Sequence, residues 1–218
     1  MWAFITFFGD SNFTLPGAAL LFLWLVCNSR WQQALRWGWW FGLAMLLVAV
    51  SKILFMAWNI APPLLNFTGI SGHSASAAML YLGMALLLSQ EHGAGRRLFY
   101  LSLAALLVVA IAMSRLILGA HSMSEVIAGV GIGAFAVFLF NASLASPDPQ
   151  PDTAPMKGKS LMAASLLLLL LLTDGRPAPT QTILEEIAQA LSGQSRTYDR
   201  AVPLQEAAPA PEKQKRPV

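Results

Sequence analysis

The stretch SRLILGAHSMSE, residues 114–125, places an arginine, a histidine and a glutamate inside sequence that is otherwise apolar. Leu98 to Met113 before it and Val126 to Phe140 after it contain no charged residue. An arginine at the centre of a bilayer costs about 2.5–3.5 kcal/mol on insertion scales, so we expect Arg115 at a membrane face or in a wet cavity. The stretch is therefore interpreted as a polar site between two membrane helices.

The composition is that of an integral membrane protein. Of the 218 residues, 56% are hydrophobic and 11% are charged, which is too apolar for an ordinary soluble domain. The basic residues behind the net charge of +3 are dispersed, so no nucleic-acid partner is expected. Cys27 is the single cysteine, which excludes an intrachain disulfide and a cysteine-based metal site. No basic leader precedes the first apolar residues, so we expect the first helix to stay in the membrane.

Six apolar runs suit membrane helices, which need about 17–25 residues. They lie near Leu15–Cys27, Trp37–Trp58, Ser74–Ser89, Arg97–Met113, Ser124–Phe140 and Ser160–Thr173. We therefore predict an all-α fold, an integral membrane bundle of about six transmembrane helices. The segment Met1–Asp10 is expected either to extend the first span or to lie at the level of the headgroups.

The composition also divides the chain into four parts. These are a transmembrane core over residues 1–145, a proline-rich linker over 146–159, a last transmembrane helix over 160–173 and a polar, partly disordered tail over 174–218. Within the tail, Thr180–Leu191 is predicted to form a short amphipathic helix. Its apolar side would carry Ile183, Leu184, Ile187 and Leu191.

Basic residues beside the spans predict the orientation of the bundle. They are Arg30, Arg36, Arg96, Arg97, Lys157 and Lys159, in three connections on the same side of a six-helix zigzag. Lysine and arginine mark the cytoplasmic side. The opposite side then receives both termini and the connections Asn59–His73 and Ser114–His121. We expect a bacterial inner membrane, in which that opposite side is the periplasm.

Three polar sets face this second compartment in the predicted topology. They are Lys52, then Ser71 with Gly72 and His73, then Arg115 with His121 and Glu125. The lysine and arginine supply fixed positive charge, and the serine hydroxyl and the backbone N–H groups at a helix start supply donors. That combination suits a phosphate. The simpler alternative for the lysine and the arginine is that they reach lipid headgroups from the ends of their spans.

Two histidines beside such a pocket can divide the chemistry of phosphoryl transfer. One attacks phosphorus, and the other donates a proton to the leaving oxygen. Because His121 and Glu125 are four residues apart, a helix places them on one face, where the carboxylate can fix the imidazole tautomer. Ser122-x-x-Glu125 is also a capping box, and the two roles can coexist. Gly129 and Gly133 continue the spacing and predict close packing against another span.

The three polar sets resemble the sequence blocks of the type 2 phosphatidic acid phosphatases, which share a fold and active site with vanadium haloperoxidases. The family pattern is a lysine, six residues and Arg-Pro, then Pro-Ser-Gly-His, then Ser-Arg, five residues, histidine, three residues and aspartate. This chain departs from the pattern at three places. Asn59-Ile60 stands for Arg-Pro, Ile70 for the proline before Ser71, and Glu125 for the aspartate.

The resemblance implies a role for each matching residue. His121 would be the nucleophile that forms a phosphohistidine, Glu125 its orienting partner and His73 the general acid. The phosphoryl oxygens would be held by Lys52, Ser71, Gly72 and Arg115. No metal or other cofactor is implied for the phosphatase members, and the sequence offers no separate cluster of metal ligands.

The expected function is therefore that of a membrane lipid phosphatase. The substrates that the resemblance suggests are undecaprenyl diphosphate, phosphatidic acid, phosphatidylglycerol phosphate and lipid A phosphate. The lipid tail can stay in hydrocarbon while the headgroup enters the charged pocket, so the expected partners are a lipid phosphate and membrane lipids. Two alternatives stay open: a lipid phosphotransferase with the same site, and a non-catalytic lipid-binding or transport protein of the same fold.

Overall fold

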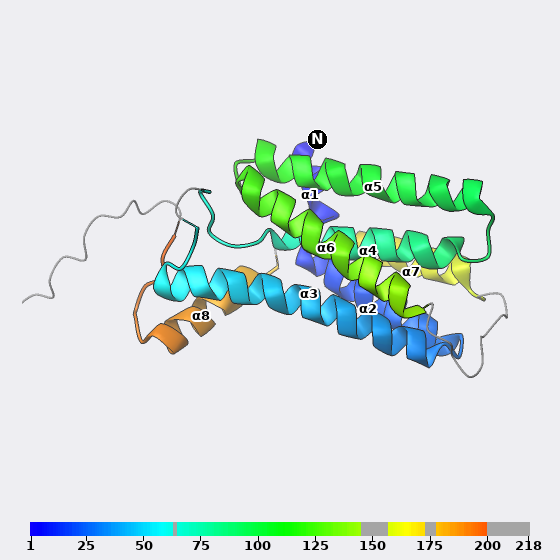
Figure 1. The fold of residues 1–218 in the computed structure, drawn as a ribbon, viewed down its shortest axis with the longest axis horizontal. Helices are drawn as coiled ribbons and strands as arrows, with labels where there is room; N and C mark the ends of the chain where they lie inside the picture. The colour runs from blue at the N-terminus through cyan, green and yellow to red at the C-terminus, as the bar shows by residue number, and fades with distance from the viewer. Residues whose placement is uncertain (63–64, 145–156, 173–177, 200–218) are drawn as a thin grey trace, which may run out of the picture.

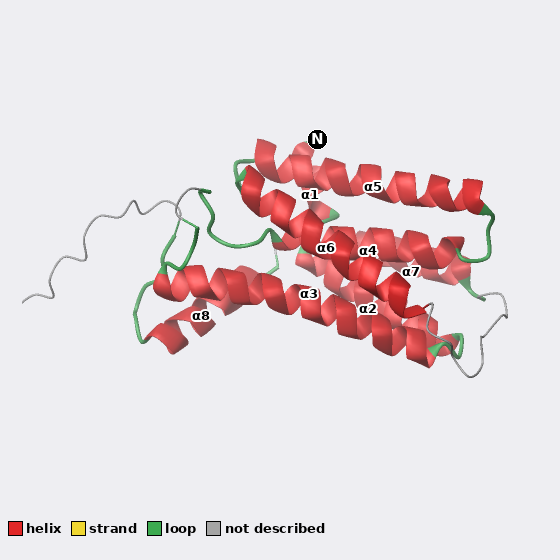
Figure 2. Cartoon of the chain, in the orientation of Figure 1, coloured by secondary structure: helices red, strands yellow, loops and turns green. Residues whose placement is uncertain are grey.

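The computed structural model is a bundle of helices (Figures 1 and 2), and it describes residues 1–62, 65–144, 157–172 and 178–199. The helices in these residues are α1 (Trp2–Phe7), α2 (Ser11–Cys27), α3 (Trp31–Trp58), α4 (Gly72–Ser89), α5 (Ala94–Ile117), α6 (Met123–Leu144), α7 (Lys159–Leu172) and α8 (Thr180–Ser192). No strand occurs among the described residues, and the predicted all-α class is confirmed there. Most of the predicted linker and the end of the tail, residues 200–218, lie outside this part of the chain.

The number of long spans differs from the prediction of about six. Within the described residues, four helices are long and apolar enough to cross a membrane: α3, α4, α5 and α6. The other two predicted spans are the shorter helices α2, with 17 residues, and α7, with 14. At 1.5 Å per residue, even α2 extends about 25 Å, less than the roughly 30 Å of a bilayer core.

The first predicted span is short because the chain turns before it. The segment Met1–Asp10 does not extend α2, because it forms the separate helix α1 and a turn through Gly9. Its place at the level of the headgroups stays a prediction. The side chain of Asp10 then accepts a hydrogen bond from the N–H of Asn12 at 2.8 Å and caps the start of α2. An aspartate at this position stops helix extension toward the N-terminus, because it satisfies the first free N–H groups.

Helix α4 is the centre of the bundle and packs against α2, α3, α5 and α6. Small side chains on α4 and glycines on α6 let the two helices come close. A Cβ atom added to Gly129 would lie 2.6 Å from the carbonyl oxygen of Ser71, and one added to Gly133 would lie 2.5 Å from that of Ala75. The predicted close packing of this glycine face is confirmed, and its partner is α4.

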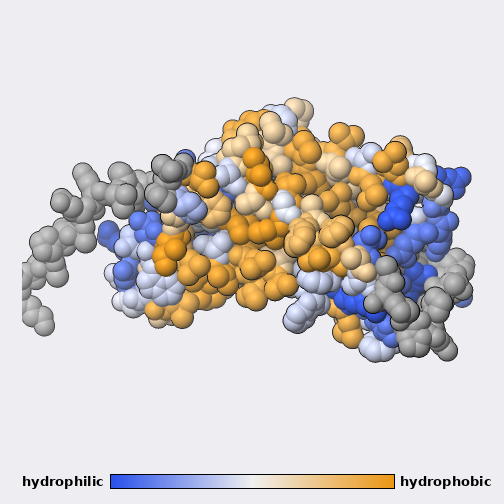
Figure 3. Space-filling model, viewed as in Figure 1, coloured by the Kyte–Doolittle hydropathy of each residue, from blue (hydrophilic) through white to orange (hydrophobic). Residues whose placement is uncertain are grey.

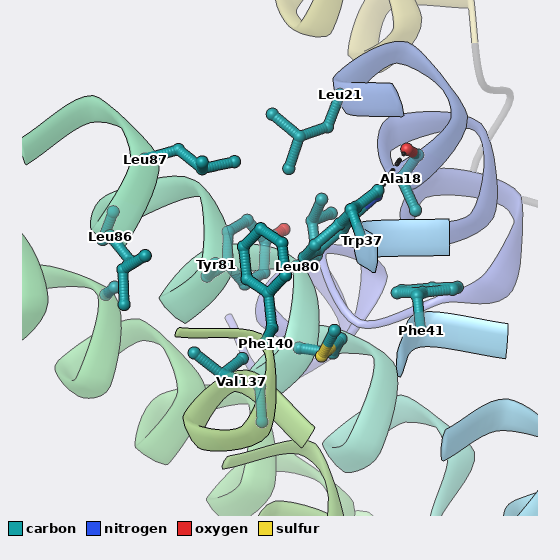
Figure 4. Packing of buried hydrophobic residues seen from close by; sticks show 14 of the residues in the cluster. Ala18, Leu21, Trp37, Phe41, Leu80, Tyr81, Leu86, Leu87, Val137 and Phe140 are labelled. Carbon is teal, nitrogen blue, oxygen red and sulfur yellow. Dashed lines mark hydrogen bonds between the residues drawn. The ribbon is translucent and has the colours of Figure 1, made fainter. Parts of the chain in front are cut away.

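Large aromatic residues fill the bundle on the other side of α4 (Figure 4). Trp37 of α3 is 1% exposed, and its ring packs 5.6 Å from the rings of Phe41 and Phe140. Its indole N–H donates to the carbonyl oxygen of Ala18 at 3.1 Å. The buried indole donor is thus satisfied, and the ring contributes a large apolar area to the core.

The three predicted basic connections meet at one end of the bundle. Arg30 donates to Gln90 Oε1 at 3.1 Å, and Arg36 donates to the carbonyl oxygen of Ser143 at 2.8 Å. The carbonyl oxygen of Lys157 accepts from the indole of Trp24. In Figure 3, hydrophilic side chains gather at the end where α3 and α5 begin, and apolar side chains cover the middle of the molecule. The three connections thus lie at one end of the bundle, as predicted, while the side of the membrane that this end faces stays a prediction.

The amphipathic tail helix exists, but with a different face packed. Helix α8 lies along α3, where Leu184 and the buried Ala188 contact Phe55 and Met56. The other predicted apolar residues are exposed: Ile183, Ile187 and Leu191. The small side chain of Ala188 permits the close contact with α3, which the apolar pattern alone did not predict.

Candidate active site

The predicted site residues gather at the end of the bundle opposite the basic connections. There the backbone N–H of Ser71, just before α4, donates to the carbonyl oxygen of Glu125 at 3.1 Å. The loop between α3 and α4 also reaches α6, because Ser124 Oγ donates to the carbonyl oxygen of Leu65 at 2.8 Å. Sequence blocks about fifty residues apart are therefore in direct contact.

His121 and Glu125 form a close pair. The distance between His121 Nδ1 and Glu125 Oε2 is 2.7 Å, and the Glu125 side chain is fully buried. An ionised carboxylate can only accept a hydrogen bond, so Nδ1 carries the proton and Nε2 keeps its lone pair. The pair thus fixes the tautomer in which Nε2 is a nucleophile.

Glu125 is itself held in place by backbone and side-chain donors. Its Oε1 accepts from the N–H and from the hydroxyl of Thr68, the latter at 2.7 Å. Its Oε2 accepts from the N–H of Ser122 at 3.0 Å, while the N–H of Glu125 donates to Ser122 Oγ at 3.4 Å. The second exchange is the predicted capping box. Glu125 therefore caps α6 and orients His121 at the same time.

His73, the second predicted catalytic histidine, faces a carboxylate that sequence reasoning missed. Its Nε2 lies 3.4 Å from Oδ2 of Asp10, in the turn between α1 and α2. Asp10 lies far from His73 in the sequence, and before an apolar helix it resembles an ordinary N-cap. Nothing in the sequence pattern relates it to the site.

Arg115 points into the site and not toward headgroups. Its Nη1 donates to Thr6 Oγ1 of α1 at 2.9 Å, while its Nε is buried and has no hydrogen-bond partner in the structure. The guanidinium also lies within electrostatic range of Lys52, His73 and His121. A buried donor without a partner, with a lysine and two histidines nearby, fits an anion.

Lys52 approaches the site from the end of α3. Its Nζ donates to Gln181 Oε1 of α8 at 3.2 Å. The loop before α4 passes directly over it, since a Cβ added to Gly69 would lie 2.7 Å from Lys52 Cγ. Gly69 has φ +136°, which favours glycine. The structure thus brings all three predicted sets together, and the contact with Gln181 was not foreseen.

Ser71 and Gly72 form the start of α4. The Ser71 side chain is fully buried, and its Oγ accepts from Ser74 Oγ at 3.0 Å, so the hydroxyl points into the bundle. No side chain caps α4, which begins at Gly72. The first N–H groups of a helix lack intrahelical partners, and together with the helix dipole they suit an anion. This geometry fits phosphate binding through the backbone at Gly72 better than through the hydroxyl of Ser71.

Two departures from the family pattern have a structural reason. The N–H of Ile60 donates to the carbonyl oxygen of Leu54 at 3.2 Å and closes the end of α3, and Asn59 before it has φ 54°. The N–H of Ile70 donates to Ser51 Oγ at 3.0 Å. Proline lacks this N–H, so a proline at either position would lose a hydrogen bond that the structure makes.

Two ionisable groups of the site, His121 and Asp10, lie outside the spans, and the pKa of each is lowered. Burial lowers the pKa of His121 below the usual value of histidine, although the hydrogen bond and charge of Glu125 act against this. Burial acts to raise the pKa of Asp10, but the hydrogen bonds from His73 and from the N–H of Asn12 outweigh it and the pKa is lowered. At neutral pH His121 is therefore neutral and Asp10 is ionised. Among the described residues, no group of three His, Cys, Asp or Glu side chains is placed to hold a metal ion.

Comparisons with known proteins agree with this geometry. The family model described as the PAP2 superfamily matches residues 61–146, which contain the second and third blocks. The chain is also similar to an uncharacterized 22.5 kDa protein in the cps region of Klebsiella pneumoniae, with 36% identity over 201 residues, 91% of this chain and 95% of the relative. No solved structure matches. The resemblance inferred from the blocks is confirmed at the level of the superfamily.

Proposed function

Because the chain belongs to the PAP2 superfamily, we propose that it is a membrane phosphatase that hydrolyses a lipid phosphate or diphosphate through a phosphohistidine on His121. The observation that carries the proposal is the 2.7 Å contact between His121 Nδ1 and the buried carboxylate of Glu125. It leaves Nε2 free to attack. The cationic groups of Lys52 and Arg115, together with the uncapped start of α4, then surround the place of a phosphoryl group.

The reaction has two balanced steps. In the first, His121 Nε2 attacks phosphorus, the bond between phosphorus and the leaving oxygen breaks, and His73 gives its proton to that oxygen. In the second, water attacks phosphorus, the P–N bond breaks, and His73 takes the proton of the water. Phosphate leaves, and both histidines return to their starting states. The free Nε of Arg115 would donate to a phosphoryl oxygen in both steps.

A lipid substrate is supported by the apolar surface along the spans. Large apolar side chains are exposed along the spans, among them Leu106 of α5 and Phe138 of α6, each more than 60% exposed. A surface of this kind suits hydrocarbon, where a lipid tail would lie. The substrates we propose to test are those that the sequence suggested: undecaprenyl diphosphate, phosphatidic acid, phosphatidylglycerol phosphate and lipid A phosphate.

We further propose that α2 and α7 complete a six-span bundle in a bacterial inner membrane, with the site facing the periplasm. The two short helices pack against each other. Tilted neighbours and local thinning of the bilayer accommodate short spans at modest cost. The basic connections at the opposite end would then lie in the cytoplasm. A reporter fused after residue 218 should be active only outside the cytoplasm, and cytoplasmic activity would contradict this orientation.

The proposed activity is tested by phosphate release. The purified protein, treated with a chelator in detergent–lipid micelles, should release inorganic phosphate from at least one of the four lipids, and His121→Ala should not. His92→Ala is the matched control, because His92 lies in the connection between α4 and α5 and contacts Tyr100. Phosphate that appears on an added lipid alcohol and not in solution would identify a phosphotransferase. Binding of lipid phosphates without turnover would contradict the enzymatic proposal.

A further inference from the structure

We propose that Asp10 is a positioning residue for the general acid: it orients His73 and favours the protonated imidazole that gives its proton to the leaving oxygen. This inference rests on the proposed phosphatase function. It adds a segment outside the matched residues 61–146, the turn between α1 and α2, to the catalytic machinery.

The two oxygens of Asp10 have different partners. Oδ1 accepts from the N–H of Asn12 at 2.8 Å, which is the capping bond of α2, whereas Oδ2 lies 3.4 Å from His73 Nε2. A capping role needs only the first oxygen. The second therefore remains for the histidine, and the Asp10 residue as a whole is 8% exposed.

The turn that carries Asp10 is fixed to the helix that carries His73. Tyr81 of α4 donates its hydroxyl to the carbonyl oxygen of Phe8 at 2.7 Å. Gly9 allows the close approach, because an added Cβ would lie 2.6 Å from Ile111 Cγ2 and 3.3 Å from His73 Cβ. The distance between Asp10 and His73 is thus set by α4 itself and does not depend on a loose loop.

The surrounding charges explain why the general acid needs a carboxylate. His73 is within electrostatic range of Arg115 on α5, whose charge disfavours a positive imidazole. Asp10 is the acidic group that faces His73 among the described residues. Its charge and hydrogen bond act against burial and the charge of Arg115, and so favour the protonated His73 that breaking the P–O bond requires.

Asp10→Asn removes the negative charge that faces His73 but keeps a side chain that can cap α2. Asparagine caps a helix as well as aspartate does, so α2 and the melting temperature should be preserved. The variant should hydrolyse phosphatidic acid about 10- to 100-fold more slowly, because its alkoxide leaving group needs a proton. With p-nitrophenyl phosphate, whose leaving group is already acidic, the rate should stay within about threefold of the unmodified protein. The alkaline limb of the phosphatidic acid pH–rate profile should also move to lower pH.

Three further variants serve as controls for Asp10→Asn. Glu186→Gln removes an exposed acid on α8 and should change neither rate. Tyr81→Phe removes the bond to the Phe8 carbonyl and should give the same substrate dependence in weaker form. Asp10→Ala removes cap and charge together and should lower the melting temperature as well.

The results distinguish a failure of the role proposed for Asp10 from a failure of the proposed phosphatase function. If Asp10→Asn hydrolyses both substrates normally, or slows both equally with a lower melting temperature, the positioning role is wrong although the phosphatase function stands. If the unmodified protein releases phosphate from neither substrate nor from the other lipid phosphates, the proposed function fails, and the role of Asp10 fails with it.

Discussion

Two histidine–carboxylate pairs lie at this end of the bundle, and they differ in how firmly the carboxylate is held. Glu125 is fully buried, lies 2.7 Å from His121 and also accepts from Thr68 and Ser122. The Asp10 side chain is 11% exposed and lies 3.4 Å from His73. Both carboxylates stand at helix starts, and both cap their helix as well as facing a histidine.

The difference suits the two proposed roles. A nucleophile must keep one tautomer and one direction through the whole reaction, so its partner is buried and held by several donors. A general acid loses and regains a proton in each cycle, which a longer and more exposed contact permits. Variants of both pairs test whether His121, in the closer pair with Glu125, is the nucleophile.

The largest effect should come from the nucleophile itself. His121→Ala should lower turnover of every phosphate substrate by at least about 10⁴-fold, because no other group can form the covalent bond. His73→Ala should lower turnover by about 10²- to 10⁴-fold with phosphatidic acid and much less with p-nitrophenyl phosphate. Steady-state phosphate release measures both. The opposite assignment would hold if the substrate dependence appeared in the His121 variant.

Glu125→Gln should cost about 10³-fold in turnover. The amide nitrogen is a donor, so it would pair with an unprotonated His121 Nδ1 and shift the proton to Nε2, where it blocks attack. The amide nitrogen in the place of Oε2 also cannot accept from the N–H of Ser122, so the free energy of unfolding should fall by about 1–3 kcal/mol. Glu125→Asp keeps the charge and the residue of the family pattern. It should lose less activity than Glu125→Gln, and the reverse order would contradict the role of charge.

The rate of phosphoenzyme formation should stay high until the pH falls below the usual pKa of histidine. Burial lowers the pKa of His121, so the imidazole stays neutral, and phosphoenzyme formation stays fast, as the pH falls below the usual range of histidine. Below the lowered pKa the rate should fall about tenfold per pH unit, as the neutral form is protonated. Because Glu125 raises this pKa, Glu125→Gln should move the acid limb to still lower pH. Rapid-quench rates across pH 4–8 measure the limb, and a shift to higher pH would contradict the assignment.

The smallest effect should come from the donors behind Glu125. Thr68→Val removes the hydroxyl that donates to Oε1 but keeps the backbone N–H. Turnover should fall only a few-fold, while the free energy of unfolding should fall by about 1.5–3 kcal/mol, the value of a hydrogen bond to a charged group. Thr68→Ser keeps the hydroxyl and is the control. A loss in Thr68→Ser without a loss in Thr68→Val would show that the methyl group, and not the hydroxyl, supports Glu125.

Much of the site could be predicted from the sequence because its parts are short and local. The four-residue spacing of His121 and Glu125 places both at one helix start, and Ser122 completes a capping box at the same place. The glycine spacing likewise predicted a close helix contact. Such features depend on helix geometry, which the sequence determines over a few residues.

The contacts made by distant segments could not be predicted. Thr6, Asp10 and Gln181 reach the site from α1, the following turn and α8, and no local pattern relates a polar side chain in these segments to the site. The number of long spans could not be predicted for a different reason. Hydropathy measures how apolar a run is, but the N-cap at Asp10 decides where α2 begins.

The most direct test of the account is to identify the atom that carries phosphate during turnover. The protein would be mixed with labelled phosphatidic acid, quenched in alkali within milliseconds and digested for mass spectrometry. We predict an acid-labile phosphate on His121, attached through Nε2. A phosphate on Ser71 or another residue, or rapid turnover in His121→Ala, would contradict the central claim.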